Sequence, residues 1–222
     1  MTIEQLSDST QDYLKAIWLA EEWSDEPVTA TVVSQRVGVT LSTTSDALRR
    51  LRRSGLIDHA PYGSITLTAA GRAHAVDMVR RHRLIETFLV QVLDYTWDQV
   101  HEEAEILEHA VSEFMIARIA DYLGHPDRDP HGDPIPAADG SVERLTAISL
   151  THLGVGVSAS IERISDDDPA LLQYFASHGV AHGTIIELAE GAPFSDTVKL
   201  VAPEAQLTLG PAALDAVWVT PV

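Results

Sequence analysis

The segment between residues 28 and 54 runs Val28-Thr-Ala-Thr-Val-Val-Ser-Gln-Arg-Val37, then Gly38-Val-Thr40, then Leu41-Ser-Thr-Thr-Ser-Asp-Ala-Leu-Arg-Arg-Leu-Arg-Arg-Ser54. Apolar residues recur there at helical spacing on both sides of a glycine, which predicts a short helix, a turn and a second helix. This order is typical of a helix-turn-helix, whose second helix enters the major groove of DNA. The expected core of the motif consists of Val32, Val33, Val37, Val39, Ala47, Leu48 and Leu51.

The flanking sequence completes a winged form of this motif. Tyr13, Leu14, Ile17 and Trp18 recur at three- and four-residue spacing, which predicts a first helix over residues 10–23. After the motif, two short strand-like runs at residues 55–59 and 64–68 surround the turn Pro61-Tyr-Gly63, which predicts a hairpin, the wing. We therefore expect a DNA-binding domain over residues 1–74.

Two further parts follow. Residues 75–140 are expected to form an all-helical dimerisation and metal-binding domain. Its helices are predicted to end near residue 92, to begin at Thr96-Trp97-Asp98 with a core that includes Phe114, and to run over residues 113–123. The proline- and glycine-rich residues 124–140 are typical of a linker. Short alternating runs in residues 141–222, interrupted by a helix over residues 169–177, predict a small β-barrel. The expected fold class is α+β.

Composition limits the chemistry that is available. The chain has 222 residues and no cysteine, so only histidine and carboxylate side chains can serve as strong metal ligands. No apolar stretch approaches the length of a membrane-spanning helix, and we expect a cytoplasmic protein. The net charge is −18, but residues 1–74 are nearly balanced, with 7 basic and 9 acidic side chains. Four of these basic residues lie within five positions, Arg49, Arg50, Arg52 and Arg53, a local patch suited to phosphate.

Candidate metal ligands gather in the middle of the chain. In the run His101-Glu-Glu-Ala-Glu105-Ile-Leu-Glu108-His109, the imidazoles and carboxylates at positions 101, 105, 108 and 109 lie close to one face of a helix. His82 and Glu86 form a second such pair on the preceding helix. Packed antiparallel, the two helices would bring six ligands together. Such a set suits Mn2+ or Fe2+ better than soft ions, although Zn2+ would also bind. The alternative is a pair of solvated helix faces whose charges pair locally.

At this point the chain resembles the diphtheria toxin repressor family of metalloregulators, in particular its manganese-transport-regulator branch. The residues that carry the resemblance are Asp8-Ser-Thr-Gln-Asp12-Tyr-Leu, the winged helix-turn-helix, Arg80-Arg-His82-Arg-Leu-Ile-Glu86, Val100-His101-Glu-Glu-Ala-Glu105-Ile-Leu-Glu108-His109 and Asp129-Pro-His-Gly-Asp-Pro-Ile-Pro136. The match spans residues 6–140. It continues more weakly into a C-terminal domain that resembles the family's SH3-like, FeoA-type barrel.

The resemblance implies two metal sites. The activating site would comprise Asp12, Glu105, Glu108 and His109. The second would comprise His82, Glu86 and His101, with Asp168 as the acid that the C-terminal domain contributes. Iron-sensing members have Met and Cys where this chain has Asp12 and Glu105, and the harder ligands favour Mn2+, with Fe2+ second. Zn2+, Co2+, Cd2+ or Ni2+ are expected to substitute in vitro. Lys15 is a departure, because some manganese-sensing members carry a further carboxylate there, which argues against that kind of two-manganese cluster.

The resemblance also implies a homodimeric repressor that binds palindromic, double-stranded operator DNA and controls genes of metal uptake, with the metal as corepressor. The base-facing candidates are Thr40, Ser42, Thr43 and Ser45, and helix capping is expected to account for one of them. Asp46 is an unusual acid in this helix, which either accepts from a cytosine or points away from DNA. The candidates for phosphate and backbone contact are Arg49, Arg50, Arg53 and, in the wing, Tyr62 and Ser64.

Two other functions compete with this interpretation. A ferritin-like di-metal carboxylate enzyme would use the same ligands, but it leaves the helix-turn-helix unexplained. A winged-helix regulator of an organic ligand would leave the His/Glu face solvated.

Overall fold

The structure, a computed structural model, describes residues 6–24, 26–59, 63–143 and 146–222. It divides into two compact units. One comprises Met1–His82, Glu108–Ala110 and Pro136–Ser141, and the other comprises Arg83–Leu107, Val111–Ile135 and Val142–Val222. None of the helices formed by the described residues is both long enough and apolar enough to cross a membrane.

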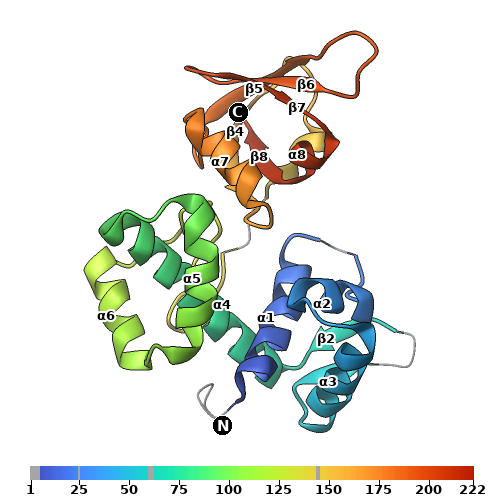
Figure 1. Cartoon of the computed structure of the whole chain (residues 1–222), viewed down its shortest axis with the longest axis vertical. Helices are drawn as coiled ribbons and strands as arrows, with labels where there is room; N and C mark the ends of the chain where they lie inside the picture. Colours follow the sequence, from blue (N-terminus) through green and yellow to red (C-terminus); the bar gives the residue numbers. More distant parts are fainter. Residues whose placement is uncertain (1–5, 25, 60–62, 144–145) are drawn as a thin grey trace. The chain divides into compact units, whose positions relative to one another are not determined.

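The first unit contains the expected winged helix-turn-helix (Figure 1). Its elements are α1 (Asp8–Glu22), α2 (Ala30–Val37), α3 (Leu41–Arg53), β1 (Ile57–His59) and β2 (Ile65–Leu67). The Thr29 and Thr40 side chains accept hydrogen bonds from the first turns of α2 and α3, which satisfies amide groups that have no partner within the helix. Between the two helices Gly38 adopts a φ of 71°, in the left-handed region that glycine enters without strain.

A shared apolar core holds these elements together. Leu14, Ile17, Val33 and Leu48 are at most 1% exposed, whereas Val39, expected in this core, is 37% exposed. In the wing, β1 pairs antiparallel with β2.

Gly71 lies in the first turn of α4 (Ala69–Leu93), just after the wing. A Cβ atom at this position would lie 1.9 Å from the carbonyl oxygen of Leu56, so the close contact requires glycine.

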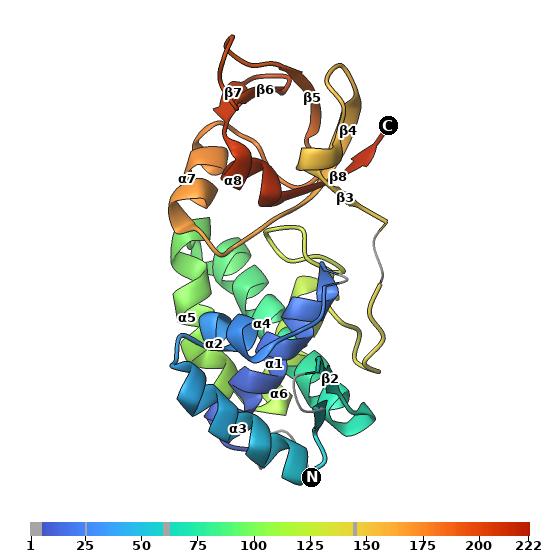
Figure 2. The ribbon, with the colours of Figure 1, turned by 90° about the vertical axis from the view of Figure 1, so that its right-hand side faces the viewer.

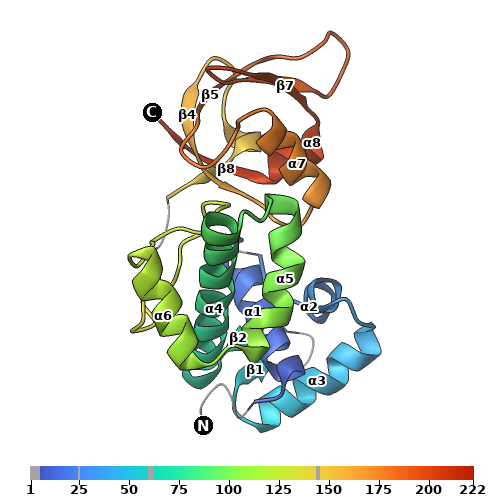
Figure 3. The same cartoon turned by 60° about the vertical axis from the view of Figure 1, so that its left-hand side comes forward.

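Three helices form the core of the middle part of the chain: the second half of α4, α5 (Trp97–Ala110) and α6 (Glu113–Leu123). Figure 3 shows the three together, and their contact is built from Leu84, Ile85, Leu89, Val100, Ala104, Ile116, Ile119 and Ala120. The expectation that Phe114 belongs to this core is wrong. The α5 helix ends at Ala110, and Phe114, in the first turn of α6, is 76% exposed.

Residues 124–140 are not a free linker, which corrects the prediction from composition. They have little regular structure apart from one β-bridge between Arg128 and Pro134, but most of residues 129–136 are buried. Asp133 fixes the segment within the second unit, because its carboxylate pairs with Arg83 at 3.1 Å and with Arg163 at 2.8 Å. Proline and glycine ruled out regular structure here, but tertiary contacts still bury the segment.

The C-terminal part contains an antiparallel sheet of six strands in the order β3-β8-β4-β5-β6-β7 (Figure 2). The strands are β3 (Ile148–Ser149), β4 (Ser158–Ile164), β5 (Ile185–Glu190), β6 (Val198–Val201), β7 (Gln206–Leu209) and β8 (Val217–Pro221). Helices α7 (Pro169–Ser177) and α8 (Pro211–Asp215) and a short 3-10 turn, η2 (Leu150–His152), pack against the sheet and close its core. The expected α+β class with an SH3-like C-terminal domain is confirmed.

Candidate metal centre

An acid of α1 meets the end of α5 in the first unit. The Nε2 atom of His109 lies 2.9 Å from Oδ1 of Asp12 and 3.7 Å from Oε1 of Glu108. The ligand atoms of these three residues all lie within 4.8 Å of one another. We call this group, Asp12, Glu108 and His109, the α1–α5 cluster. It unites residues that are almost a hundred positions apart in sequence.

The imidazole of His109 is oriented by a neighbour that the sequence did not suggest. Its Nδ1 atom lies 2.7 Å from Oε1 of Gln11, a buried side chain whose amide nitrogen donates to the Leu6 carbonyl. Because Oε1 can only accept, Nδ1 carries the proton, and Nε2 turns its lone pair toward Asp12 and Glu108 when the ring is neutral. This orientation prepares Nε2 to bind a metal ion.

Glu108 carries the electrostatic weight of the cluster. It is 0% exposed, and its two oxygens lie 2.6 Å from Nζ of Lys15 and 2.5 Å from Nδ1 of His82. Burial alone would raise the pKa of Glu108, but the neighbouring charges of His82 and Lys15 and their hydrogen bonds lower it. The carboxylate therefore stays ionised, as a metal ligand must.

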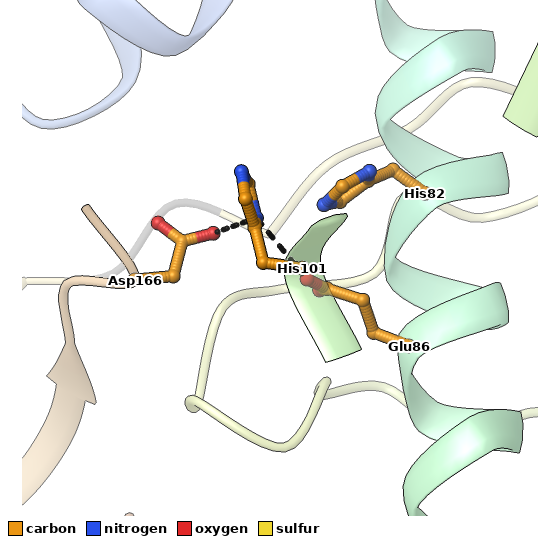
Figure 4. A group of neighbouring side chains, drawn as sticks. All are labelled: His82, Glu86, His101 and Asp166. Atoms are coloured by element: carbon orange, nitrogen blue, oxygen red, sulfur yellow. Dashed lines mark ion pairs between the residues drawn. The ribbon is translucent and has the colours of Figure 1, made fainter. Parts of the chain in front are cut away.

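A second group lies in the second unit. His101 on α5 places Nδ1 3.5 Å from Oε1 of Glu86 on α4 and 3.1 Å from Oδ2 of Asp166. Figure 4 shows these side chains together with His82, which precedes Glu86 by one turn of α4. Burial by itself would lower the pKa of His101, but hydrogen bonds to Asp166 and Glu86 raise it to about 11. The pKa of Asp166 lies well below its usual value, because its hydrogen bond to His101 outweighs burial. This pocket stabilises positive charge.

The same pocket continues to a fully buried histidine. His131 is 0% exposed, and its Nδ1 lies 3.9 Å from the other oxygen of Glu86. Within the described residues, neither ring nitrogen of His131 has a hydrogen-bond partner, and ligand atoms of Glu86, Asp129 and His131 lie within 4.8 Å of one another. Burial, followed by the nearby charge of Asp133, raises the pKa of Asp129 to about 7. Buried polar atoms without partners are costly, so the arrangement fits a bound cation.

Several site predictions can be compared with these positions. Asp12, Glu108 and His109 lie together, and Glu105 precedes them on α5, with an oxygen 3.7 Å from Nε2 of His101. Asp168 does not join the second group. Its carboxylate caps α7 by accepting from Ala170 and Leu171, and Asp166 takes the expected place.

The sequence analysis missed His131, Asp129 and Gln11. His131 was interpreted as a surface residue because a proline- and glycine-rich segment surrounds it, and this interpretation is wrong. The Asp129-Pro-His-Gly-Asp133 run was the available signal, since it places two carboxylates around one imidazole.

The DNA-facing candidates lie on or next to α3. Thr40 is the N-cap and accepts from the amide of Thr43, while Ser42 and Thr43 are exposed. Asp46 pairs with Arg49 at 2.6 Å, so Arg49 is partly neutralised and the nearby Arg50 and Arg53, both exposed, offer the stronger positive charge. Ser45 donates to the Leu41 carbonyl. Tyr62 lies outside the described residues.

Comparisons with known proteins divide the chain in the same way. Residues 5–65 match the family described as "Iron dependent repressor, N-terminal DNA binding domain". Residues 68–137 match "Iron dependent repressor, metal binding and dimerisation domain", and residues 148–221 match the FeoA domain. These three matches together cover most of the chain.

Similar proteins extend along the whole length. The iron-dependent repressor IdeR of Mycobacterium leprae (strain TN) is 30% identical over 219 residues, which cover 93% of this chain and 94% of that protein. A solved structure described as a manganese-dependent transcriptional repressor in complex with manganese is 46% identical, with a TM-score of 0.90 over 96% of this chain and 100% of the other. A structure of ScaR with bound Zn2+ is 27% identical, with a TM-score of 0.81 over 96% and 99%.

Proposed function

The chain belongs to the diphtheria toxin repressor family of metal-dependent transcriptional repressors, and from this premise we propose that Mn2+ is its corepressor and a palindromic operator its target. Its relatives are regulators rather than enzymes, so the ferritin-like di-metal enzyme considered above is excluded. The DNA-binding role falls to residues 1–74, the metal-binding and dimerisation role to residues 75–140, and residues 141–222 form the FeoA-type domain. We expect the protein to act in the cytoplasm, on genes of metal uptake.

One observation carries this proposal: Asp12 of α1 and His109 of α5 meet at 2.9 Å. The α1 helix packs directly against α2 and β2 of the DNA-binding domain. A divalent ion held by Asp12, Glu108 and His109, joined by Glu105, would supply positive charge that the carboxylates share. Without it these carboxylates repel one another, and α1 is held less firmly against α5. The ligands thus couple the state of the metal site to the domain that binds DNA.

The donor set supports Mn2+ as the first choice. The candidate ligands are carboxylate oxygens and imidazole nitrogens, and the chain has no cysteine. Hard ligands of this kind favour Mn2+ and, second, Fe2+, whereas Zn2+, Co2+, Cd2+ and Ni2+ are expected to substitute in vitro because intrinsic affinity alone does not discriminate against them. We propose a second ion in the pocket of Glu86, His101 and Asp166, with His82, Asp129 and His131 as further ligands.

A homodimer fits the surface of the second unit. Large apolar side chains are exposed on α5 and α6, namely Ile106, Phe114, Met115 and Tyr122. Exposed apolar side chains gathered on neighbouring helices indicate an interface. In a two-fold dimer the two α3 helices would enter successive major grooves about 34 Å apart.

The test is a titration of operator binding. A palindromic duplex is first selected from a random library with the Mn2+-loaded protein, and its gel shift is then titrated with Mn2+, Fe2+ and Zn2+ at one fixed salt concentration. We expect a shift at lower free Mn2+ than free Fe2+ and none in the presence of a chelator. Metal-independent binding, or no sequence-selective binding with any of the ions, would refute the proposal.

Arg50 supplies a separate prediction about the DNA interface. Arg50→Ala is expected to weaken binding to every DNA sequence and to reduce the slope of log K against log salt by about 0.9, the value for one lost phosphate contact. Arg118→Ala, which removes an exposed arginine from α6, is the matched control and should leave the slope unchanged. An equal slope for the wild-type protein and Arg50→Ala would remove Arg50 from the interface.

A further inference from the structure

Lys15 is a buried positive charge at the α1–α5 cluster. It is one of only two lysines in the sequence, the other being Lys199, and it is 6% exposed. Its Nζ atom lies 2.6 Å from Oε1 of Glu108. Lysine is seldom buried unless it is paired with an acid, so this contact accounts for the position of the ammonium group within α1.

The contact involves the oxygen that faces the proposed metal position. Oε1 of Glu108 lies 2.6 Å from Lys15 and 3.7 Å from Nε2 of His109, while Oε2 faces His82. A divalent ion held by Asp12, Glu108 and His109 would therefore lie near a fixed ammonium group on the same carboxylate oxygen. Two cations close together repel each other strongly where water is excluded.

A purely structural ion pair would have a different consequence. If Lys15 only held α1 and α5 together, its loss would disorder the cluster and weaken metal binding. If instead the ammonium shares Glu108 with the metal, its loss would leave the carboxylate more available to the ion. The two roles therefore predict opposite signs for the change in metal affinity.

We propose that Lys15 is a built-in competitor for Glu108, which neutralises that carboxylate in the metal-free protein and sets the metal concentration at which the cluster fills. This inference rests on the proposed function of the α1–α5 cluster. The ammonium group takes the place of the missing positive charge when metal is scarce. It also weakens the hold on the ion, so that the repressor responds only above a threshold.

The experiment measures Mn2+ affinity by calorimetry, with far-UV circular dichroism to establish folding. Lys15→Met, which has a similar length and no charge, is expected to bind Mn2+ about tenfold more tightly or better, the scale on which one nearby charge changes proton affinity. The metal-free variant should melt at a lower temperature than the wild-type protein, and saturating Mn2+ should close most of that gap. Lys15→Arg, which keeps the charge, should bind as the wild-type protein does, and Lys199→Met is the matched control.

The remaining outcomes are also decisive. Lys15→Gln, which keeps a hydrogen-bond donor near Oε1, replaces Lys15→Met if that variant does not fold. Unchanged or weaker Mn2+ binding by the folded neutral variant would overturn the competitor role while leaving the proposed metal site intact. His109→Ala separates the two questions: if it left Mn2+ binding at this cluster unaffected, the proposed site itself would be wrong.

Discussion

Asp12→Ala is expected to abolish the stimulation of operator binding by Mn2+ while the dimer survives. Asp12 is the α1 residue whose carboxylate lies 2.9 Å from Nε2 of His109, so its removal cuts the link between the DNA-binding domain and the ligands on α5. Coupling between an effector and DNA is typically about 1–3 kcal/mol, which corresponds to about 5–150-fold in affinity. The variant should bind operator with Mn2+ as weakly as the wild-type protein does with a chelator.

The measurement is an operator-shift titration with and without Mn2+, together with sedimentation to establish the oligomeric state. Asp8→Ala is the matched control, because it removes an exposed acid from the first turn of the same helix. It should keep full stimulation by Mn2+. Undiminished stimulation in Asp12→Ala would contradict the mechanism, whereas loss of the dimer would show that α1 has a different task.

The second large effect is expected at Asp133, whose carboxylate lies between two arginines. It is 3% exposed and pairs with Arg83 at 3.1 Å and with Arg163 at 2.8 Å. Removing one member of a buried, charged group leaves the opposite charges poorly compensated, which typically costs about 3–5 kcal/mol. Asp133→Ala should therefore reduce the free energy of unfolding of the metal-free protein by about this amount.

Urea unfolding followed by circular dichroism measures this change. Asp127→Ala removes an exposed acid six positions earlier in the same segment, and it should have little effect. A loss of less than about 1 kcal/mol for Asp133→Ala, the value of a surface ion pair, would mean that the buried pairs do not anchor the segment.

Local patterns were sufficient to predict most of the secondary structure. The period of apolar residues predicted α1, α3 and α4 to within a few residues, and the helix at Pro169–Ser177 was predicted with the bounds it has. Such elements are determined by neighbours three and four positions away. The two-residue strand β3 and the five-residue helix α8 were not predicted, because segments this short have no readable period.

Long-range contacts account for what was missed at the candidate site. His131 lies in a segment whose composition indicates a loop, and it is buried only because Arg83 and Arg163 hold the neighbouring Asp133. Asp166 and Asp168 are equivalent in sequence, and the choice between them depends on which one caps α7. Gln11 orients His109 from a distance of 98 residues. None of these relations has a local signature.

The contact between Gly71 and the Leu56 carbonyl limits how this protein can change through evolution. It lies where the wing meets the long helix that carries His82 and Glu86. Any other amino acid there would push the backbone of the wing aside. Variation in operator preference must therefore arise on the exposed residues of α3 and the wing, while this joint is inherited unchanged.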